Sequence, residues 1–240
     1  MTRTGSRETE NGGGRRVRRL GMLVPSSNTV VEAETPKLLP SDGSVTCHVA
    51  RLPVVTIAAD DGSRGQFDTG RVLAATALLA DAQVDLILWN GTAASWLGFD
   101  RDRRLADAIE RQTQIPATTA VLAINNQLAR LGARRIGLVT PYVEALEADI
   151  VRNYATIGVE IVASERLDIT DNIAFGRVPP QQIAGMIRAV ARQRPDAIVV
   201  MCTNLAGASL VDPLGAELGI PVVDSVRTAI AQCLDRLRAP

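Results

Sequence analysis

The chain alternates between two hydrophobic patterns. Short apolar runs rich in Val, Ile and Leu, such as residues 20–24 and 197–201, are bounded by polar or turn residues, which is typical of buried strands. The longer segments between them repeat apolar residues at helical spacing. Pro36 is expected to kink or end the first helix. The pattern predicts strands near 17–24, 45–51, 85–90, 135–140, 159–164, 196–201 and 221–223, and helices near 28–39, 68–82, 101–113, 119–131, 143–157, 180–193, 205–218 and 225–237.

The predicted elements recur in the two halves of the chain. One motif is an arginine pair, an apolar strand and a proline; a second is Asp, a strand and a small or reactive residue before Thr; a third is Ile-Pro, a short strand and a helix start. Three matches in the same order indicate two similar halves. The matching stretches are "RRLGMLVPSSN" (18–28) and "RRIGLVTPYVE" (134–144), "DLILWNGTAAS" (85–95) and "DAIVVMCTNLAG" (196–207), and "QIPATTAVLAI" (114–124) and "GIPVVDSVRTAI" (219–230).

Alternating strands and helices predict an α/β protein with parallel sheets. The chain is 46% hydrophobic and only 3% aromatic, so Ala, Val, Leu and Ile must form its core, which suits such sheets. We expect two flavodoxin-like lobes, each with a parallel four-stranded sheet, related by a pseudo-twofold axis. Residues 17–120 with the C-terminal helix near 225–240 form the first lobe and residues 121–224 the second. Residues 1–16 are polar and Gly-rich and are expected to be a disordered tail.

Ligands of open α/β sheets bind beyond the carboxyl ends of the strands. The repeated loops should therefore converge on one cleft between the lobes, with Gly91 and Cys202 facing each other across it. Cys202 ends a strand, and a helix that starts just after it would lower its pKa and make it reactive. Cys47 and Cys233 are interpreted as small packed hydrophobes, and His48 as a packed residue.

Composition excludes several classes of function. The formal net charge is zero, so no global basic surface is available for nucleic acid. No apolar run is long enough to span a bilayer, and the first residues lack the apolar segment of a signal peptide. The three cysteines are widely spaced, and a single histidine offers no metal-ligand pattern. We expect a cytoplasmic protein with no nucleic-acid, membrane or metal partner.

Four motifs carry a family resemblance: "GMLVPSSNTVVEAETP" (21–36), "TPYVEAL" (140–146), "DITDN" (168–172) and "VMCTN" (200–204). They resemble maleate cis-trans isomerases and arylmalonate decarboxylases of the aspartate/glutamate racemase superfamily. The resemblance covers nearly the whole chain after Arg16. It implies an enzyme that needs no metal, phosphate group or organic cofactor, acts on a small carboxylic acid and forms a homo-oligomer.

The resemblance also implies roles for two positions. Isomerases and racemases of the superfamily carry two cysteines, one from each lobe, but this chain has Gly91 at the first position and keeps only Cys202. Arylmalonate decarboxylases share that arrangement. Racemisation needs a proton donor and an acceptor on opposite faces of one carbon. Decarboxylation needs only a site that holds an enediolate and one acid. We therefore expect decarboxylation of a substituted malonate, with Cys202 protonating the enediolate.

Groups that would bind the substrate lie in the same motifs. Hydroxyls and backbone N–H groups at the starts of helices can hold an anion, and Asn28, Tyr142 and Asn172 match family positions that contact a carboxylate. The loop 92–98 and Leu205 are expected to form an apolar pocket, with Trp96 beside an aryl group. The expected substrate-binding residues are Pro25, Ser26, Ser27, Asn28, Thr92, Ala93, Tyr142, Asn172, Thr203 and Asn204.

Three other functions remain open. A maleate-type isomerase is a close second, because "PSSN" (25–28) and "TDN" (170–172) resemble the isomerase branch more than the decarboxylase branch. A non-catalytic dicarboxylate-binding protein would follow from loss of the first cysteine. A cysteine hydrolase acting on a cyclic amide would need His48 to reach the cleft as the base that activates Cys202.

Overall fold

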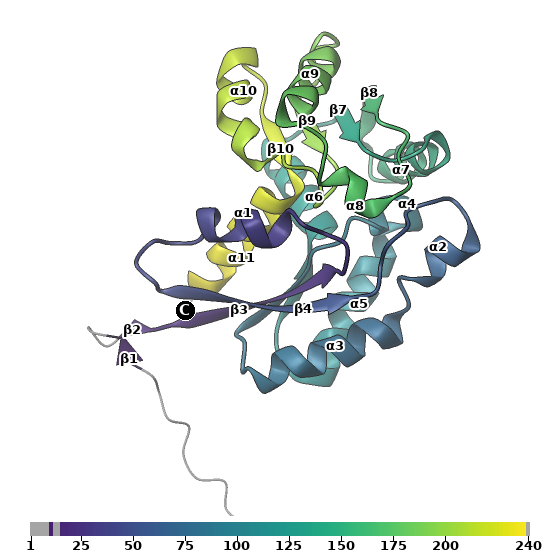
Figure 1. Cartoon of the computed structure of the whole chain (residues 1–240). Helices are drawn as coiled ribbons and strands as arrows, with labels where there is room; N and C mark the ends of the chain where they lie inside the picture. Colours follow the sequence, from purple (N-terminus) through teal and green to yellow (C-terminus); the bar gives the residue numbers. More distant parts are fainter. Residues whose placement is uncertain (1–9, 12–14, 239–240) are drawn as a thin grey trace, which may run out of the picture.

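The computed structural model describes residues 10–11 and 15–238 and contains two parallel four-stranded sheets (Figure 1). The strand order of the first sheet is β4-β3-β5-β6, and that of the second is β8-β7-β9-β10, so both sheets have the same topology. The prediction of two parallel four-stranded sheets is confirmed. The strands of the first sheet are β3 (Arg18–Pro25), β4 (Val45–Leu52), β5 (Leu86–Trp89) and β6 (Ala117–Thr119), and those of the second are β7 (Arg135–Thr140), β8 (Glu160–Arg166), β9 (Ala197–Val200) and β10 (Val222–Asp224).

Helices connect the strands, as the apolar spacing predicted. The helix predicted over 205–218 is shorter, because an irregular loop and a 3-10 turn precede it, and three short helices were not predicted: α2, α4 and α8. The first helix ends two residues after Pro36. The helices are α1 (Val31–Leu38), α2 (Asp61–Gly65), α3 (Thr69–Asp81), α4 (Ala94–Leu97), α5 (Phe99–Thr113), α6 (Ala120–Leu131), α7 (Glu144–Thr156), α8 (Asn172–Phe175), α9 (Pro180–Ala191), η1 (Ala208–Leu210), α10 (Val211–Leu218) and α11 (Ser225–Arg238).

The repeated aspartate and arginine pair connect equivalent strands in the two sheets. The Asp85 carboxylate accepts the backbone N–H of Arg19 at 2.7 Å. The Asp196 carboxylate accepts the backbone N–H groups of Arg134 and Arg135 at 2.9 and 2.8 Å. Each aspartate therefore satisfies backbone donors at the start of the neighbouring strand, which would otherwise lack a partner. The repeated motif therefore joins the two central strands of each sheet, β3 to β5 and β7 to β9.

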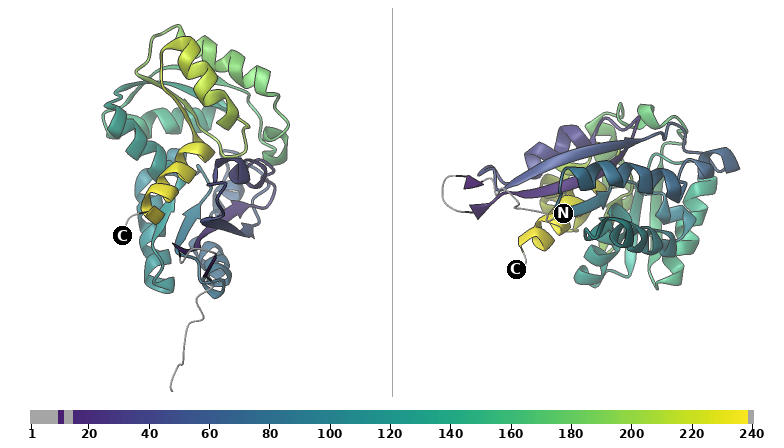
Figure 2. Two further views of the ribbon diagram at one scale, coloured as in Figure 1. Left: turned by 90° about the vertical axis from the view of Figure 1, so that its left-hand side faces the viewer. Right: turned by 90° about the horizontal axis from the view of Figure 1, so that it is seen from below.

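The C-terminal helix α11 crosses from the second sheet to the first (Figure 2). Val226, Ile230 and Cys233 pack with Leu20 and Met22 of β3 in one buried cluster. The division into lobes at residue 120 stays a prediction.

The short strands β1 (Glu10–Asn11) and β2 (Arg15–Arg16) pair in an antiparallel manner within the segment expected to be disordered. The rest of that expected tail lies outside the described residues.

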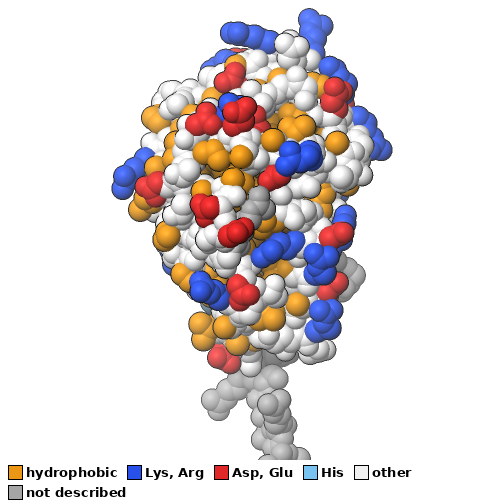
Figure 3. Space-filling view, turned by 90° about the vertical axis from the view of Figure 1, so that its right-hand side faces the viewer, with side chains coloured by type: hydrophobic (Ala, Val, Ile, Leu, Met, Phe, Trp, Pro, Cys, Tyr) orange, Lys and Arg blue, Asp and Glu red, His pale blue; other side chains and the backbone are white. Residues whose placement is uncertain are grey.

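The surface carries charges of both signs. On the face shown in Figure 3, Lys and Arg side chains are interspersed with Asp and Glu. Among the helices of the described part, none is long and apolar enough to cross a membrane. Cytoplasmic location and a homo-oligomeric state stay predictions.

Candidate active site

Residues from both sheets line one small cavity at the carboxyl ends of the strands. Its volume is about 20 Å³, which is room for about one water molecule. Gly91 follows β5 and Cys202 follows β9, and both line this cavity, as their equivalent positions predicted. The small carboxylic acid expected from the sequence is larger than this space. The lining residues are Pro25, Asn28, Val54, Ile57, Phe67, Gly91, Thr92, Ala93, Trp96, Tyr142, Asn172, Cys202 and Thr203.

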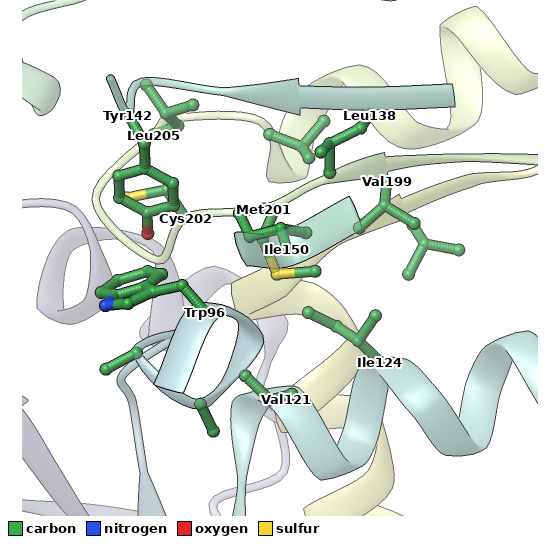
Figure 4. Close-up of a cluster of buried hydrophobic side chains, with 14 of the residues drawn as sticks. Trp96, Val121, Ile124, Leu138, Tyr142, Ile150, Val199, Met201, Cys202 and Leu205 are labelled. Carbon is green, nitrogen blue, oxygen red and sulfur yellow. The ribbon is translucent and has the colours of Figure 1, made fainter. Parts of the chain in front are cut away.

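Thr92, Tyr142 and Cys202 lie together among the polar side chains that line this cavity. The hydroxyls of Thr92 and Tyr142 lie 2.6 Å apart, and the backbone N–H of Asn204 donates to the Cys202 sulfur at 3.3 Å. Tyr142 is 1% exposed and lies beside Cys202 and Trp96 (Figure 4). The Tyr142 hydroxyl therefore interacts with groups from both halves of the chain.

Burial controls the protonation of Cys202 and Tyr142. It raises the pKa of Cys202 to about 12, although the backbone N–H of Asn204 and the Tyr142 hydroxyl oppose the shift. Burial also raises the pKa of Tyr142 well above its usual value, and a charge on Cys202 raises it further. The prediction that a helix start lowers the pKa of Cys202 is wrong. The next helical turn begins only at Ala208, and removal of the thiolate from water dominates. Cys202 is a protonated thiol at neutral pH.

Asn28 has two functions in this structure. Its side-chain oxygen accepts the backbone N–H groups of Val30 and Val31 at the start of α1, at 2.9 and 3.0 Å. Its amide nitrogen donates to the Thr203 hydroxyl at 3.2 Å, and that hydroxyl donates to the carbonyl of Asn90. Asn28 therefore begins a helix and fixes Thr203 from the other half at the cavity wall.

Ser26, Ser27 and Asn204 do not line the cavity. The Ser27 hydroxyl donates to the Val54 carbonyl at 2.6 Å and accepts the Asn172 amide at 2.7 Å. The Ser26 hydroxyl accepts the backbone N–H of Val54 at 3.3 Å. The Asn204 amide donates to the carbonyl of Asn172 and its oxygen accepts the backbone N–H of Thr29. Ser27 and Asn204 therefore join the two halves around the cavity, whereas Ser26 bonds within the first half. Contact of these three side chains with substrate stays a prediction.

Sequence reasoning missed the apolar wall formed by Val54, Ile57 and Phe67. All three lie in the connection between β4 and α3, where regular periodicity ends. The backbone N–H of Ile57 donates to the carbonyl of Thr170 at 2.8 Å, which holds this connection against the second half. The signal was an apolar run, "PVVTI" (53–57), placed in a polar loop. Trp96, expected beside an aryl group, lies 4.6 Å from the Tyr142 ring between centroids.

Other candidate chemistry lies elsewhere. His48 does not line the cavity; its Nε2 atom lies 3.1 Å from the Thr46 hydroxyl on β4, so the hydrolase hypothesis lacks its base. Cys47 is half-buried and Cys233 buried, both as free thiols packed in or against the cluster under α11, as predicted. Within the described ranges, no group of three His, Cys, Asp or Glu side chains is placed to hold a metal.

Comparison with known proteins identifies the family. The arylmalonate decarboxylase family model matches residues 20–239. The chain belongs to the arylmalonate decarboxylase family. A maleate isomerase from Nocardia farcinica is 28% identical over 233 residues, which cover 93% of this chain and 92% of that protein. The arylmalonate decarboxylase of Bordetella bronchiseptica is 26% identical over 209 residues, 86% of this chain and 85% of that protein.

Solved structures agree with this family. The maleate isomerase Iso from Pseudomonas putida S16 has a TM-score of 0.86 and 26% identity, with 94% of each chain covered. A cysteine-to-serine mutant of the Nocardia farcinica maleate cis-trans isomerase carries a covalently bound succinylcysteine intermediate, and its TM-score is 0.86 at 27% identity, covering 93% of this chain and 94% of that one. The relatives are isomerases and a decarboxylase, so this chain is an enzyme of the isomerase or lyase type.

Proposed function

We propose that this enzyme decarboxylates a substituted malonate and that Cys202 protonates the product carbon. One observation carries the proposal: among the residues that line the cavity, Cys202 is the single cysteine and has a raised pKa, and Gly91, at the equivalent position of the other half, has no side chain. An acid that must hold its proton until a carbanion forms is suited by a raised pKa. A nucleophile that must attack as a thiolate is not.

The proposed reaction has two steps. The bond between the α-carbon and one carboxylate breaks, CO2 leaves, and the electron pair passes into the remaining carboxylate to form an enediolate. Cys202 then gives its S–H proton to the α-carbon. The product is a monocarboxylate, and the Cys202 thiolate takes a proton from water to restore the enzyme. No second acid or base is required, which fits a glycine, Gly91, in the lining of the same cavity.

Thr92 and Tyr142 are the proposed donors to the enediolate oxygens. Their buried hydroxyls lie 2.6 Å apart and share a hydrogen bond with each other. An oxyanion that binds beside the pair would receive a hydrogen bond from both hydroxyls once that bond breaks, away from bulk water. Val54, Ile57, Phe67 and Trp96 supply an apolar wall for the carboxylate that leaves as neutral CO2. A carboxylate that faces this apolar wall loses its charge, as CO2, more easily than one that faces the polar side chains of the cavity.

Isomerisation of a maleate-like alkene is the second candidate function. It is favoured by the nearly full-length match to maleate isomerases, which extends over 91–93% of the chain at 25% and 28% identity for two of them. The Cys202 thiolate would have to add to the double bond, and rotation about the new single bond would precede its elimination. The raised pKa of Cys202 opposes formation of that thiolate.

Proton NMR in D2O distinguishes the candidates. The purified enzyme is incubated with maleate and with a panel of substituted malonates, beside Cys202→Ser and a control, Cys47→Ser, whose half-buried thiol lies outside the cavity. We expect a mono-deuterated carboxylic acid from a malonate, lost at least about 100-fold in Cys202→Ser and retained in Cys47→Ser.

Fumarate formed from maleate, without turnover of any malonate, would overturn the decarboxylase proposal in favour of isomerisation. Thermal stabilisation by a dicarboxylate that survives Cys202→Ala, without turnover of either substrate class, would indicate a binding protein instead.

A further inference from the structure

Gly91 lies against the indole ring of Trp89, two residues earlier in the chain. A Cβ atom placed on Gly91 would lie 2.3 Å from Cζ2, 2.4 Å from Cε2 and 2.7 Å from Nε1 of Trp89. These separations are far inside van der Waals contact, which begins near 3.5 Å for two carbon atoms. The backbone of Gly91 does not require glycine, because Gly91 is absent from the described glycines with positive φ. The neighbouring ring alone excludes a side chain here.

Trp89 has little freedom to make room. It is 3% exposed, it is the last residue of the buried strand β5, and its ring belongs to the main hydrophobic core. Phe67 and Ala93 line a second small cavity with Trp89 and also line the cavity of Cys202. A rigid ring packed on several sides moves only with its neighbours. The indole therefore fixes one wall behind the candidate active site.

The internal repeat allows the two halves to be compared at the position of Trp89, because the second half has a cysteine where the first has Gly91. Trp89 and Gly91 in the first half correspond to Val200 and Cys202 in the second. Val200 is also buried at the end of a strand, β9, but its side chain is much smaller than an indole. The second half therefore combines a small residue with a cysteine, and the first half combines a large residue with a glycine.

We propose that Trp89 is the specificity-determining residue that keeps this site a one-cysteine site. The indole occupies the space that a thiol at position 91 would need, so the only thiol of the cavity approaches the substrate carbon from the side of Cys202. In chemical terms, Trp89 blocks two-sided proton transfer, and with it racemisation of the product. The block on racemisation rests on the proposed decarboxylation. The steric coupling of Trp89 to Gly91 does not depend on that proposal.

A stability cycle tests the coupling without any substrate. The variants are Gly91→Cys, Trp89→Val and the double variant, with Gly185→Cys as control, because a Cβ atom at Gly185 meets nothing within 4 Å. We expect Gly91→Cys to lower the Tm by roughly 3–10 °C in the native background, as overpacking of a core does. In the Trp89→Val background, the same change should lower the Tm by less than about 2 °C. Equal losses in the two backgrounds would overturn the proposal.

Exchange of the product's α-hydrogen tests the consequence. A single enantiomer of the 2-substituted acid made by the native enzyme is incubated in D2O with each variant. We expect the double variant to exchange this hydrogen and racemise the acid at least about 10-fold faster than the native enzyme or either single variant, because only it has a donor and an acceptor on opposite faces.

Exchange by Gly91→Cys alone, as fast as in the double variant, would show that Trp89 does not block the second thiol. If the Tm losses show the coupling but the double variant does not exchange the product's α-hydrogen, the proposed block on racemisation is overturned. If the native enzyme decarboxylates no malonate, the proposed function fails while the Tm cycle still decides the coupling.

Discussion

At the scale of single residues, the candidate site depends on a thiol kept out of water. Burial raises the pKa of Cys202 to about 12, and the Tyr142 hydroxyl, placed between Thr92 and Cys202, opposes that rise. In the proposed decarboxylation, the single Tyr142 O–H would donate first to the enediolate and then to the thiolate left on Cys202. Both hydrogen bonds depend on one oxygen atom.

Tyr142→Phe tests the use of that oxygen atom. We expect it to lower kcat by about 10²–10³, because one preorganised donor is lost, with a small change in stability. The matched control is Tyr154→Phe. Tyr154 is equally buried, packs on Phe99, and its hydroxyl has no hydrogen-bond partner in the described structure. Full activity of Tyr142→Phe, or an equal loss in both variants, would contradict the proposed role.

The sequence predicts some of these residue contacts and not others. Pro25, Gly91, Thr92, Tyr142 and Cys202 line one cavity because each follows a parallel strand, and such strands end at the same edge of a sheet. The protonation of Cys202 could not be predicted, because local signals of a helix start say nothing about burial. Equally, no pattern indicates that Trp89 bends back onto Gly91, since both belong to one short motif whose side-chain packing is tertiary.

At the scale of elements, the connection between β4 and α3 forms one wall of the cavity. It supplies Val54, Ile57 and Phe67 to the wall, and an antiparallel bridge joins Thr56 to Asp171 of the other half. Buried strands are predictable from runs of apolar residues, but the path of this irregular connection is set by contacts distant in sequence. For that reason the sequence predicted the cavity residues at the strand ends but not the apolar wall formed by Val54, Ile57 and Phe67.

Gln66 holds this connection in place. Its side-chain oxygen accepts the backbone N–H of Val55 and its amide donates to the carbonyl of Thr56, both at 2.8 Å. We expect Gln66→Ala to raise the hydrogen-exchange rate of the peptide covering residues 53–58 by about 3- to 10-fold, as loss of one or two modest hydrogen bonds predicts.

A second glutamine provides the control for exchange measured by mass spectrometry. The Gln112 amide donates to the carbonyl of Leu73 at 2.9 Å, away from the cavity, so Gln112→Ala should leave residues 53–58 unchanged. The cavity has room for about one water molecule, and we expect this segment to open when substrate enters. An unchanged exchange rate in Gln66→Ala would show that other contacts hold the connection closed.

At the scale of the whole molecule, each half contains an almost fully buried aspartate. Asp102 on α5 packs beside the first sheet and is 2% exposed, and Asp224 ends β10 of the second sheet at 1% exposed. Burial raises the pKa of each to about 7. One oxygen of each carboxyl group lacks a hydrogen-bond partner in the described structure. Folding therefore stabilises the protonated, neutral form of both carboxyl groups, which makes the free energy of unfolding depend on pH.

Asp102→Asn isolates this dependence. The pKa of Asp102 rises from 3.8 to about 7 on folding, so the native state holds a proton that the unfolded chain releases between these pH values. The free energy of unfolding therefore falls as the pH rises from about 4 to about 7 and is level above that. We expect Asp102→Asn to equal the native enzyme near pH 4 and to exceed it at pH 8 by about 2–4 kcal/mol in urea unfolding. Asp107→Asn, which removes an exposed charge from the same helix, is the control for the loss of one carboxylate from α5. A constant difference between Asp102→Asn and the native enzyme across this range would mean that Asp102 stays ionised in the folded molecule.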